Sequence, residues 1–236
     1  MKTLLLSSDI QRESIEQLSS LGYRVLTLPR YKALPTPISS HPDSLVFKGE
    51  GQIITDKDYF YENEELFSEI SSHSGVDVVI SGDKLGNKYP SDTRLNAIEL
   101  SDKLFCRRES VSSAILEYAK KAGLSVINTK QGYPACSTLK IAENAVICAD
   151  RGLAKLYRSV GISVYEIEPS GISLPPYEYG FIGGASTVAD GFVFFFGSLS
   201  THPSYKIIER ALEEHSLCPV SLGKGVLCDL GGGILL

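Results

Sequence analysis

The sequence lacks the features that mark several common classes of protein. It contains no tryptophan, a single methionine and four histidines in 236 residues. Its five cysteines are an odd number and form no C-x-x-C pair, so neither a disulfide framework nor a zinc site is expected. No apolar run approaches the roughly 20 residues needed to span a bilayer. The N-terminal segment becomes polar too soon for a secretory signal peptide.

An excess of positive charge is also missing. The formal net charge is −5, and acidic and basic residues are interspersed along the chain. This pattern predicts neither a nucleic-acid partner nor an anionic membrane partner. Because no Gly/Ser/Pro-rich linker or charge break divides the chain, we expect residues 1–236 to form a single domain. The expected compartment is the cytoplasm.

What the sequence does contain is one pattern that recurs about five times, with a period near 45–50 residues, which is typical of radially repeated or stacked folds. Each unit predicts a short apolar strand, a tight polar turn, a second strand, a helix and a third strand. The first complete unit has predicted strands at 44–47, 52–54 and 76–80. The strands predicted for the later units are 95–98, 104–106, 124–127, 138–141, 145–148, 187–188 and 192–196.

The two ends of the chain supply the remaining unit. Residues 233–236 predict its first strand, residues 3–6 its second and residues 23–26 its third. Pairing of these end strands would close a ring and remove exposed sheet edges.

The predicted helices share their start and stop signals. Start signals are a capping side chain or an N1 proline, at Asp9, Asp56, Ser110 and 201–203. Stop signals are glycines at or just beyond the C-cap, at Gly22, Gly75, Gly123 and Gly161.

Reactive side chains are concentrated in the polar loops between units. These loops are 39–43, 88–92, 131–137, 180–186 and 228–233. In a ring of five units they would face one another around the axis, which would bring together Cys136, His41 and Asp229. An ordinary open α/β sheet that binds another ligand is the alternative architecture.

Three of the loops resemble those of the guanidino-group-modifying enzyme superfamily, which has the pentein fold, a five-fold pseudosymmetric ββαβ α/β-propeller. His41-Pro42-Asp43 resembles its His-x-Asp loop, and Tyr133-Pro134-Ala135-Cys136-Ser137 resembles its nucleophile segment. Asp229-Leu230-Gly231-Gly232 resembles its acidic-Gly-Gly loop. The cyclic order of acid, histidine and cysteine also agrees. The cysteine lies mid-chain here and near the C-terminus in the superfamily, which indicates a circularly shifted member.

The resemblance implies a hydrolase or an amidinotransferase that acts on a small guanidino or amidino compound. Cys136 would form a covalent thiouronium-type intermediate, His41 would act as acid and base, and Asp229 would orient the imidazole. A free thiol has a pKa near 8.5, so a neighbouring cation, a histidine or the bound guanidinium must lower it. No metal and no organic cofactor are implied.

A second set of residues is predicted to bind the substrate. Asp43 would accept charge-assisted hydrogen bonds from the guanidinium, with Asp92 as a second carboxylate. Arg107 and Arg108 would bind a substrate carboxylate. His202 and Tyr179 would lie near the same mouth, with Tyr177 and Phe181 beside Tyr179 in the longest loop.

Each candidate also has a purely structural interpretation. Cys136 could be a small buried residue, His41 a turn residue before proline, and Asp229 a backbone acceptor in a Gly-rich turn. His202 could cap a helix, the two arginines could be a solvated helix start, and the aromatic loop could cover the core. The paired glycines predict tight turns, because they lack the spacing of a dinucleotide fingerprint. The functional alternative is a non-enzymatic pentein-fold module that docks a protein, as a ribosome-binding translation initiation factor does.

Overall fold

The computed structural model describes residues 2–236, whose strands form five separate three-stranded sheets and one two-stranded sheet. In each three-stranded sheet the middle strand pairs antiparallel with the first strand and parallel with the third. The sheets are β17 (Ile234–Leu235), β1 (Thr3–Ser7) and β2 (Arg24–Leu28); β3 (Val46–Gly49), β4 (Gln52–Asp56) and β5 (Asp77–Ser81); β6 (Ile98–Leu100), β7 (Lys103–Cys106) and β8 (Ser125–Asn128); β9 (Thr138–Ala142), β10 (Ala145–Cys148) and β11 (Ser163–Glu166); β13 (Ser186–Ala189), β14 (Phe192–Phe196) and β15 (Cys218–Leu222); and β12 (Ile172–Ser173) with β16 (Leu227–Cys228).

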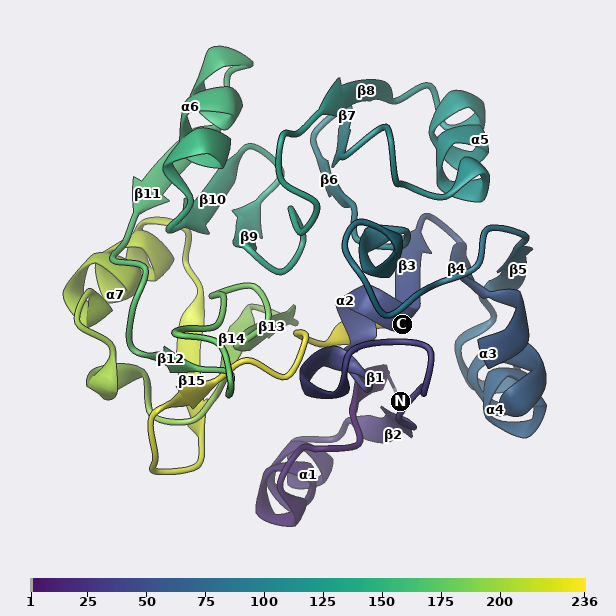
Figure 1. Ribbon diagram of the computed structural model, residues 1–236. Helices are drawn as coiled ribbons and strands as arrows, with labels where there is room; N and C mark the ends of the chain where they lie inside the picture. Colours follow the sequence, from purple (N-terminus) through teal and green to yellow (C-terminus); the bar gives the residue numbers. More distant parts are fainter. Residues whose placement is uncertain (1) are drawn as a thin grey trace.

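Helices connect the second and third strands of these sheets. They are α1 (Arg12–Ser20), α3 (Lys57–Glu62), α4 (Glu64–Ser74), α5 (Ser113–Lys121), α6 (Arg151–Ser159) and α7 (Tyr205–Glu214). Figure 1 shows these helices at the periphery and the first strands of the sheets toward the middle. The short helix α2 (Pro42–Leu45) is the exception, because it lies in the middle beside β1 and β3.

The first strands of all five sheets surround one space. Residues of β3, β6, β9, β13 and β17 line a cavity of about 610 Å³. Residues in the turns that precede these strands line it as well, at Asp43, Ala135, Gly183 and Gly231. The turns on which the sequence places its reactive side chains therefore lie close together.

The predicted pairing of the two end strands is confirmed, but the predicted loss of sheet edges is wrong. Leu4 pairs with Leu235 in the antiparallel β1–β17 ladder, and the amide of Leu236 donates to the carbonyl oxygen of Thr3 at 2.8 Å. This pairing completes one sheet only. The five sheets remain separate, and each keeps two edge strands of its own.

Helix termini follow the sequence signals in part. Asp56 caps α3, as predicted, by accepting from the amides of Asp58 and Tyr59. The predicted caps Asp9 and Ser110 lie too early, because α1 begins after Gln11, without a side-chain cap, and α5 begins after Ser112. The four predicted stop glycines are confirmed: Gly22, Gly75, Gly123 and Gly161 all have φ between 71° and 91°.

Two other boundaries differ from prediction. Residues 44–45 belong to α2 rather than to a strand, because Pro42 supplies a preset N1 position that starts a helical turn. The strand predicted at 95–98 begins only at Ile98, because residues 93–96 form a turn. The sequence did not predict β12 and β16, whose two residues each are too short to show alternation.

The core is built by continuous apolar strands that are covered on both faces. Phe194 and Phe195 of β14 are both fully buried, and they belong to different hydrophobic clusters on opposite faces of the strand. Burying a side chain of this size stabilises the fold by about 1.5–3 kcal/mol. In the described part of the chain, no helix is long and apolar enough to cross a bilayer.

Candidate active site

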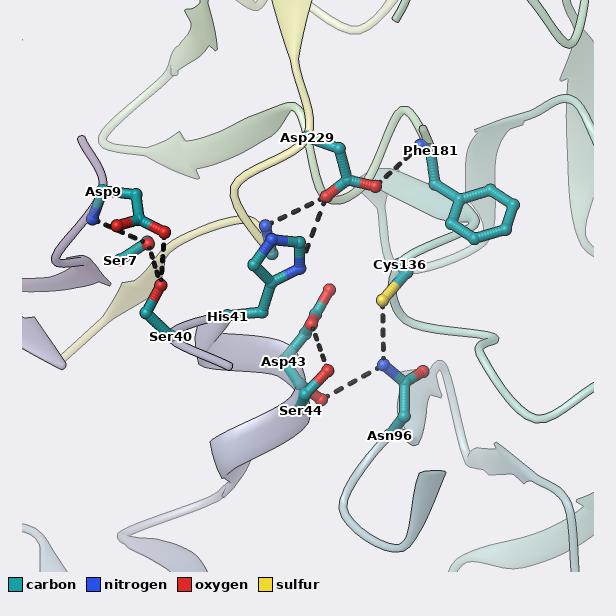
Figure 2. A network of polar contacts seen from close by, with 11 residues as sticks. Ser7, Asp9, Ser40, His41, Asp43, Ser44, Asn96, Cys136, Phe181 and Asp229 are labelled. Atoms are coloured by element: carbon teal, nitrogen blue, oxygen red, sulfur yellow. Dashed lines mark hydrogen bonds and ion pairs between the residues drawn. The ribbon is translucent and has the colours of Figure 1, made fainter. Parts of the chain in front are cut away.

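Turns that are far apart in the sequence hold the candidate reactive groups beside one another. His41 and Asp43 belong to the start of α2, Cys136 precedes β9, and Asp229 follows β16. Figure 2 shows these four side chains converging, together with Asn96 from the turn before β6. The thiol, the imidazole and the two predicted carboxylates are therefore brought together.

Cys136 sits in a tight turn in which the amide of Thr138 donates to the carbonyl oxygen of Ala135. Its side chain is buried, and its sulfur accepts a hydrogen bond from Nδ2 of Asn96 at 3.1 Å. The same Nδ2 donates to the carbonyl oxygen of Asp43 at 3.1 Å, and Oδ1 of Asn96 accepts from the amide of Ala135 at 2.9 Å. Asn96 thus joins the cysteine turn to α2.

His41 and Asp229 are neighbours without a direct hydrogen bond. Nδ1 of His41 lies 3.7 Å from Oδ1 of Asp229, which exceeds a normal hydrogen-bond length. Asp229 instead accepts from the amide of Phe181 at 2.8 Å and from the amide of Gly231 at 3.0 Å. Nδ1 of His41 is buried and has no hydrogen-bond partner. Asp229 therefore holds the loops of Phe181 and Gly231 in place by hydrogen bonds and also faces the imidazole.

Burial shifts the pKa values of the reactive side chains. It raises the pKa of the Cys136 thiol well above its usual value, and the acids Asp43 and Asp229 raise it further. Burial, with Asp229 nearby, raises the pKa of Asp43 to about 8. Burial lowers the pKa of His41, and the attraction of Asp229 opposes this only in part. The resting site thus favours a protonated thiol and a neutral imidazole, which leaves the bound guanidinium as the cation expected to lower the thiol pKa.

A cavity of about 380 Å³ opens onto the reactive groups. His41, Cys136 and Asp229 line it together with Tyr133 and Phe181, whose rings are stacked with centroids 6.5 Å apart. Its other lining residues are Ile38, Leu174, Tyr177, Glu178 and Tyr179. Asp43 lines the larger central cavity instead, and its buried Oδ2 has no hydrogen-bond partner. A ligand with several polar N–H groups could satisfy both Oδ2 of Asp43 and Nδ1 of His41.

Glycines permit the close approach of these loops. A Cβ added at Gly184 would overlap the carboxylate of Asp229, and a Cβ added at Gly231 would overlap His41. Gly231 also has φ at 74°, where side chains are strained. The paired glycines serve tight packing and turning, as the sequence predicted.

The other predicted substrate-binding residues are distributed differently. Tyr179 lines the 380 Å³ cavity at its exposed rim. Asp92 is buried outside the lining, where it accepts a hydrogen bond from the hydroxyl of Tyr133 at 2.7 Å. His202 is also outside the lining, and its Nδ1 accepts from the amide of Ser204 at 3.0 Å just before α7. His202 therefore caps the turn before α7 rather than the helix itself, whose N-cap is Ser204.

The two predicted arginines are not brought to the cavity. Arg107 pairs with Glu109 at 3.0 Å and lies over the ring of Tyr89. Arg108 donates to the carbonyl oxygen of Val126 at 3.1 Å.

Sequence reasoning missed Asn96 and Glu178. Asn96 was assigned to an apolar strand, and the only available signal was an amide side chain at a position that a strand would bury. Glu178 lies in the exposed loop 177–179, where a single acid gives no signal. In the described part of the chain, no three His, Cys, Asp or Glu side chains are arranged to hold a metal ion.

Comparison with known proteins places the chain in a family. The model of a family of unknown function, DUF6873, matches residues 5–235. The chain belongs to this family. A comparison of this DUF6873 protein with curated proteins gives no match.

Solved structures reveal the fold of the DUF6873 protein. A cysteine-to-serine mutant of DDAH from Pseudomonas aeruginosa, complexed with citrulline, matches with a TM-score of 0.59 and 11% identity, over 98% of this chain and 96% of that chain. A dimethylarginine dimethylaminohydrolase adduct with S-methyl-L-thiocitrulline matches with a TM-score of 0.61 and 11% identity, over 100% and 99%. Inosamine-phosphate amidinotransferase from Streptomyces griseus matches with a TM-score of 0.53 and 14% identity, over 92% and 75%. The DUF6873 chain has the mixed α/β fold of these pentein-type structures, as the resemblance predicted.

Proposed function

We propose that this protein is an enzyme that modifies a guanidino or amidino compound through a covalent bond to Cys136. The observation that carries the proposal is that Cys136, His41 and Asp229 line one cavity, with Asp43 beside the thiol, on a fold shared with DDAH and an amidinotransferase. The proposal treats residues 1–236 as one domain and the five sheets as pseudosymmetric blades around one axis.

Binding of the substrate would create the nucleophile. A guanidinium or amidinium ion placed between the thiol and the two acids would favour the thiolate and the carboxylates together. Asp43 would hold N–H groups of the substrate through its free Oδ2. The amide of Asn96, which already donates to the sulfur, would stabilise the negative charge on it.

Attack by the thiolate would form an S–C bond at the planar carbon of the substrate. The C–N bond to the leaving amine would break, and the amine would carry away a proton delivered through His41. Asp229, 3.7 Å from Nδ1, would stabilise the charge that develops on the imidazole. The product of this half-reaction is a thiouronium-type intermediate on Cys136 with the amine released.

The second half-reaction would return the thiol. His41 would take a proton from water, the oxygen would attack the same carbon, and the C–S bond would break. In sum, guanidinium and water give a ureido compound and an ammonium ion. An amine that replaces the water would accept the amidino group instead, as in an amidinotransferase.

Selective alkylation tests the proposal. Cys136 is buried, whereas Cys218 is exposed, so a neutral reagent such as iodoacetamide is expected to modify Cys218 first. The cationic reagent 2-chloroacetamidine is expected to reverse this order, because it would bind between the acids and be attacked by Cys136. Peptide mass spectrometry measures both rates, and Cys136→Ser is expected to abolish the reversal.

The outcome separates an enzyme from a protein-docking module. If both reagents modify Cys218 first and Cys136 stays unmodified, the covalent mechanism is wrong. If Cys136 is modified selectively, turnover is tested next. A steady release of ammonia or amine from a panel of guanidino compounds, absent in Cys136→Ser, would distinguish turnover from reactivity alone.

A further inference from the structure

The 380 Å³ cavity has a chemical bias beyond its reactive groups. Its lining includes the rings of three tyrosines and one phenylalanine and two carboxylates. They belong to Tyr133, Tyr177, Tyr179, Phe181, Glu178 and Asp229. Glu178 and its two tyrosine neighbours lie at the exposed rim, whereas the thiol lies at the buried end. The tail of a substrate held at Cys136 would therefore meet aromatic faces and one carboxylate on its way out.

No cation lines this cavity among the described residues. A candidate beside it is Arg30, which lines a neighbouring cavity of about 540 Å³ that shares His41 and Asp229. Arg30 is already paired, because its Nη2 donates to both carboxylate oxygens of Asp9, at 2.8 and 2.9 Å. A carboxylate on the substrate would thus find no free guanidinium in the cavity and would face Glu178.

We propose that the site selects guanidino or amidino compounds whose far end carries an ammonium group or no charge, and rejects those that end in a carboxylate. This inference rests on the proposed function. Glu178 would pair with the ammonium group at the rim, and Tyr177 and Tyr179 would offer their ring faces to it. A neutral alkyl tail would gain only apolar contact with the rings, and a carboxylate tail would be repelled.

Three chloroacetamidines with one reactive group and different tails test the inference. Their nitrogen carries a 4-aminobutyl, a butyl or a 4-carboxybutyl chain. In each case the sulfur of Cys136 attacks the chloromethyl carbon, the C–Cl bond breaks, chloride leaves and the thiol proton passes to solvent. At low ionic strength we expect the aminobutyl reagent to inactivate Cys136 fastest and the carboxybutyl reagent slowest, with a ratio of about fivefold or more.

Glu178→Gln identifies the selecting residue. It is expected to lower the aminobutyl-to-carboxybutyl ratio about threefold and to leave the rate of the butyl reagent unchanged. The matched control is Glu168→Gln, which removes the same charge from an exposed residue outside the cavity lining and is expected to leave the ratio unchanged.

The outcomes separate this inference from the proposed function. If unsubstituted chloroacetamidine fails to modify Cys136, the proposed function is wrong and the inference falls with it. If Cys136 reacts but the carboxybutyl reagent matches the aminobutyl one, or Glu178→Gln leaves the ratio intact, the inference alone is overturned. A carboxybutyl reagent that reacts fastest, and loses its lead in Arg30→Gln, would place the carboxylate at Arg30 instead.

Discussion

At the scale of single residues, the candidate nucleophile is surrounded by acids. Asp43 and Asp229 both raise the pKa of the Cys136 thiol, and the imidazole beside them is held neutral by burial. Under the proposed function, the thiolate would form together with a bound cationic ligand. A neutral electrophile would then meet a protonated, buried thiol.

The pH dependence of alkylation follows from the direction of the thiol pKa. Because this pKa is raised, the thiolate fraction of Cys136 is small at neutral pH and grows as the pH rises. In a Cys218→Ser background, we expect the iodoacetamide rate at Cys136 to climb beyond pH 9 without a plateau. The chloroacetamidine rate is expected to reach half its maximum at a lower pH, because the cation stabilises the thiolate. An iodoacetamide plateau below pH 8 would contradict this.

Asp43→Asn is expected to move the two reagents in opposite directions. Loss of the acid lowers the thiol pKa, so iodoacetamide should react several-fold faster at pH 9, where the Asp43 carboxyl, with a pKa of about 8, is ionised. The amidine loses its carboxylate partner, so chloroacetamidine should react about tenfold more slowly. Asp58→Asn, at an exposed carboxylate paired with Lys84, should change neither rate. Equal shifts in one direction would show that Asp43 has only a structural role.

The sequence could predict which residues meet here, but not their contacts. Cys136, His41 and Asp229 were chosen from loop chemistry and from resemblance, and the fold places them together. The link through Asn96 depends on where one strand begins, which propensity sets only to within a few residues. The arginines were predicted to bind a substrate carboxylate only because they are charged. Arg107 instead lies over the exposed ring of Tyr89, a contact that the sequence does not reveal.

At the scale of elements, glycines and caps decide how closely the turns can approach. Substitution of Gly184 tests the role of the glycines, because an added Cβ would overlap the carboxylate of Asp229. Gly184→Ala is expected to lower the free energy of unfolding by about 1–3 kcal/mol and to slow chloroacetamidine labelling of Cys136. Gly82→Ala is the matched control, since nothing lies within 4 Å of the added methyl group. An equal free energy of unfolding in urea for the two variants would show that Asp229 can move away from the added methyl group without loss of stability.

Substitution of Asp56 tests how much a helix cap contributes to stability. Its carboxylate caps α3 and also accepts from the hydroxyl of Tyr31 at 3.0 Å and from the amide of Leu85 at 2.9 Å. Asp56→Ala is expected to cost about 2–4 kcal/mol of unfolding free energy, because several buried donors lose their acceptor. Gln11→Ala, at the uncapped start of α1, should cost less than about 0.5 kcal/mol. A similar cost for both would contradict the assigned role.

Elements with strong local signals were predictable, and those set by tertiary contact were not. Positive-φ glycines marked four helix ends correctly, because few other residues adopt that conformation at low cost. Helix α2 has four residues, so no apolar periodicity could show. Strands β12 and β16 pair with each other only because the long loop after β11 returns to the segment after β15.

At the scale of the whole molecule, the adjacent ends permit a test by permutation. Thr3 and Leu236 exchange two backbone hydrogen bonds, so a short glycine linker should join the termini without strain. A permutant opened between Ser101 and Asp102, in an exposed turn, is expected to fold and to keep chloroacetamidine labelling of Cys136. A permutant opened between Gly183 and Gly184 should lose the labelling. Loss in both would show that the order of units matters to the site.

The repeat and the pairing of the ends could be predicted because each unit repeats its own local signals. The separateness of the sheets could not, since hydrogen bonding between neighbouring units depends on their spacing in three dimensions. Within the pocket rim at 177–179, the sequence pointed to the two tyrosines but not to Glu178, because exposed loops carry no periodic pattern.

The β1–β17 ladder has a consequence for biosynthesis. Leu4 pairs with Leu235, so its partner is made long after it during translation. At about 5–20 residues per second, that partner follows after roughly 10–50 s. Throughout this interval one edge of the apolar strand Thr3–Ser7 has no hydrogen-bonding partner, so the nascent chain is expected to need a chaperone until β17 has been made.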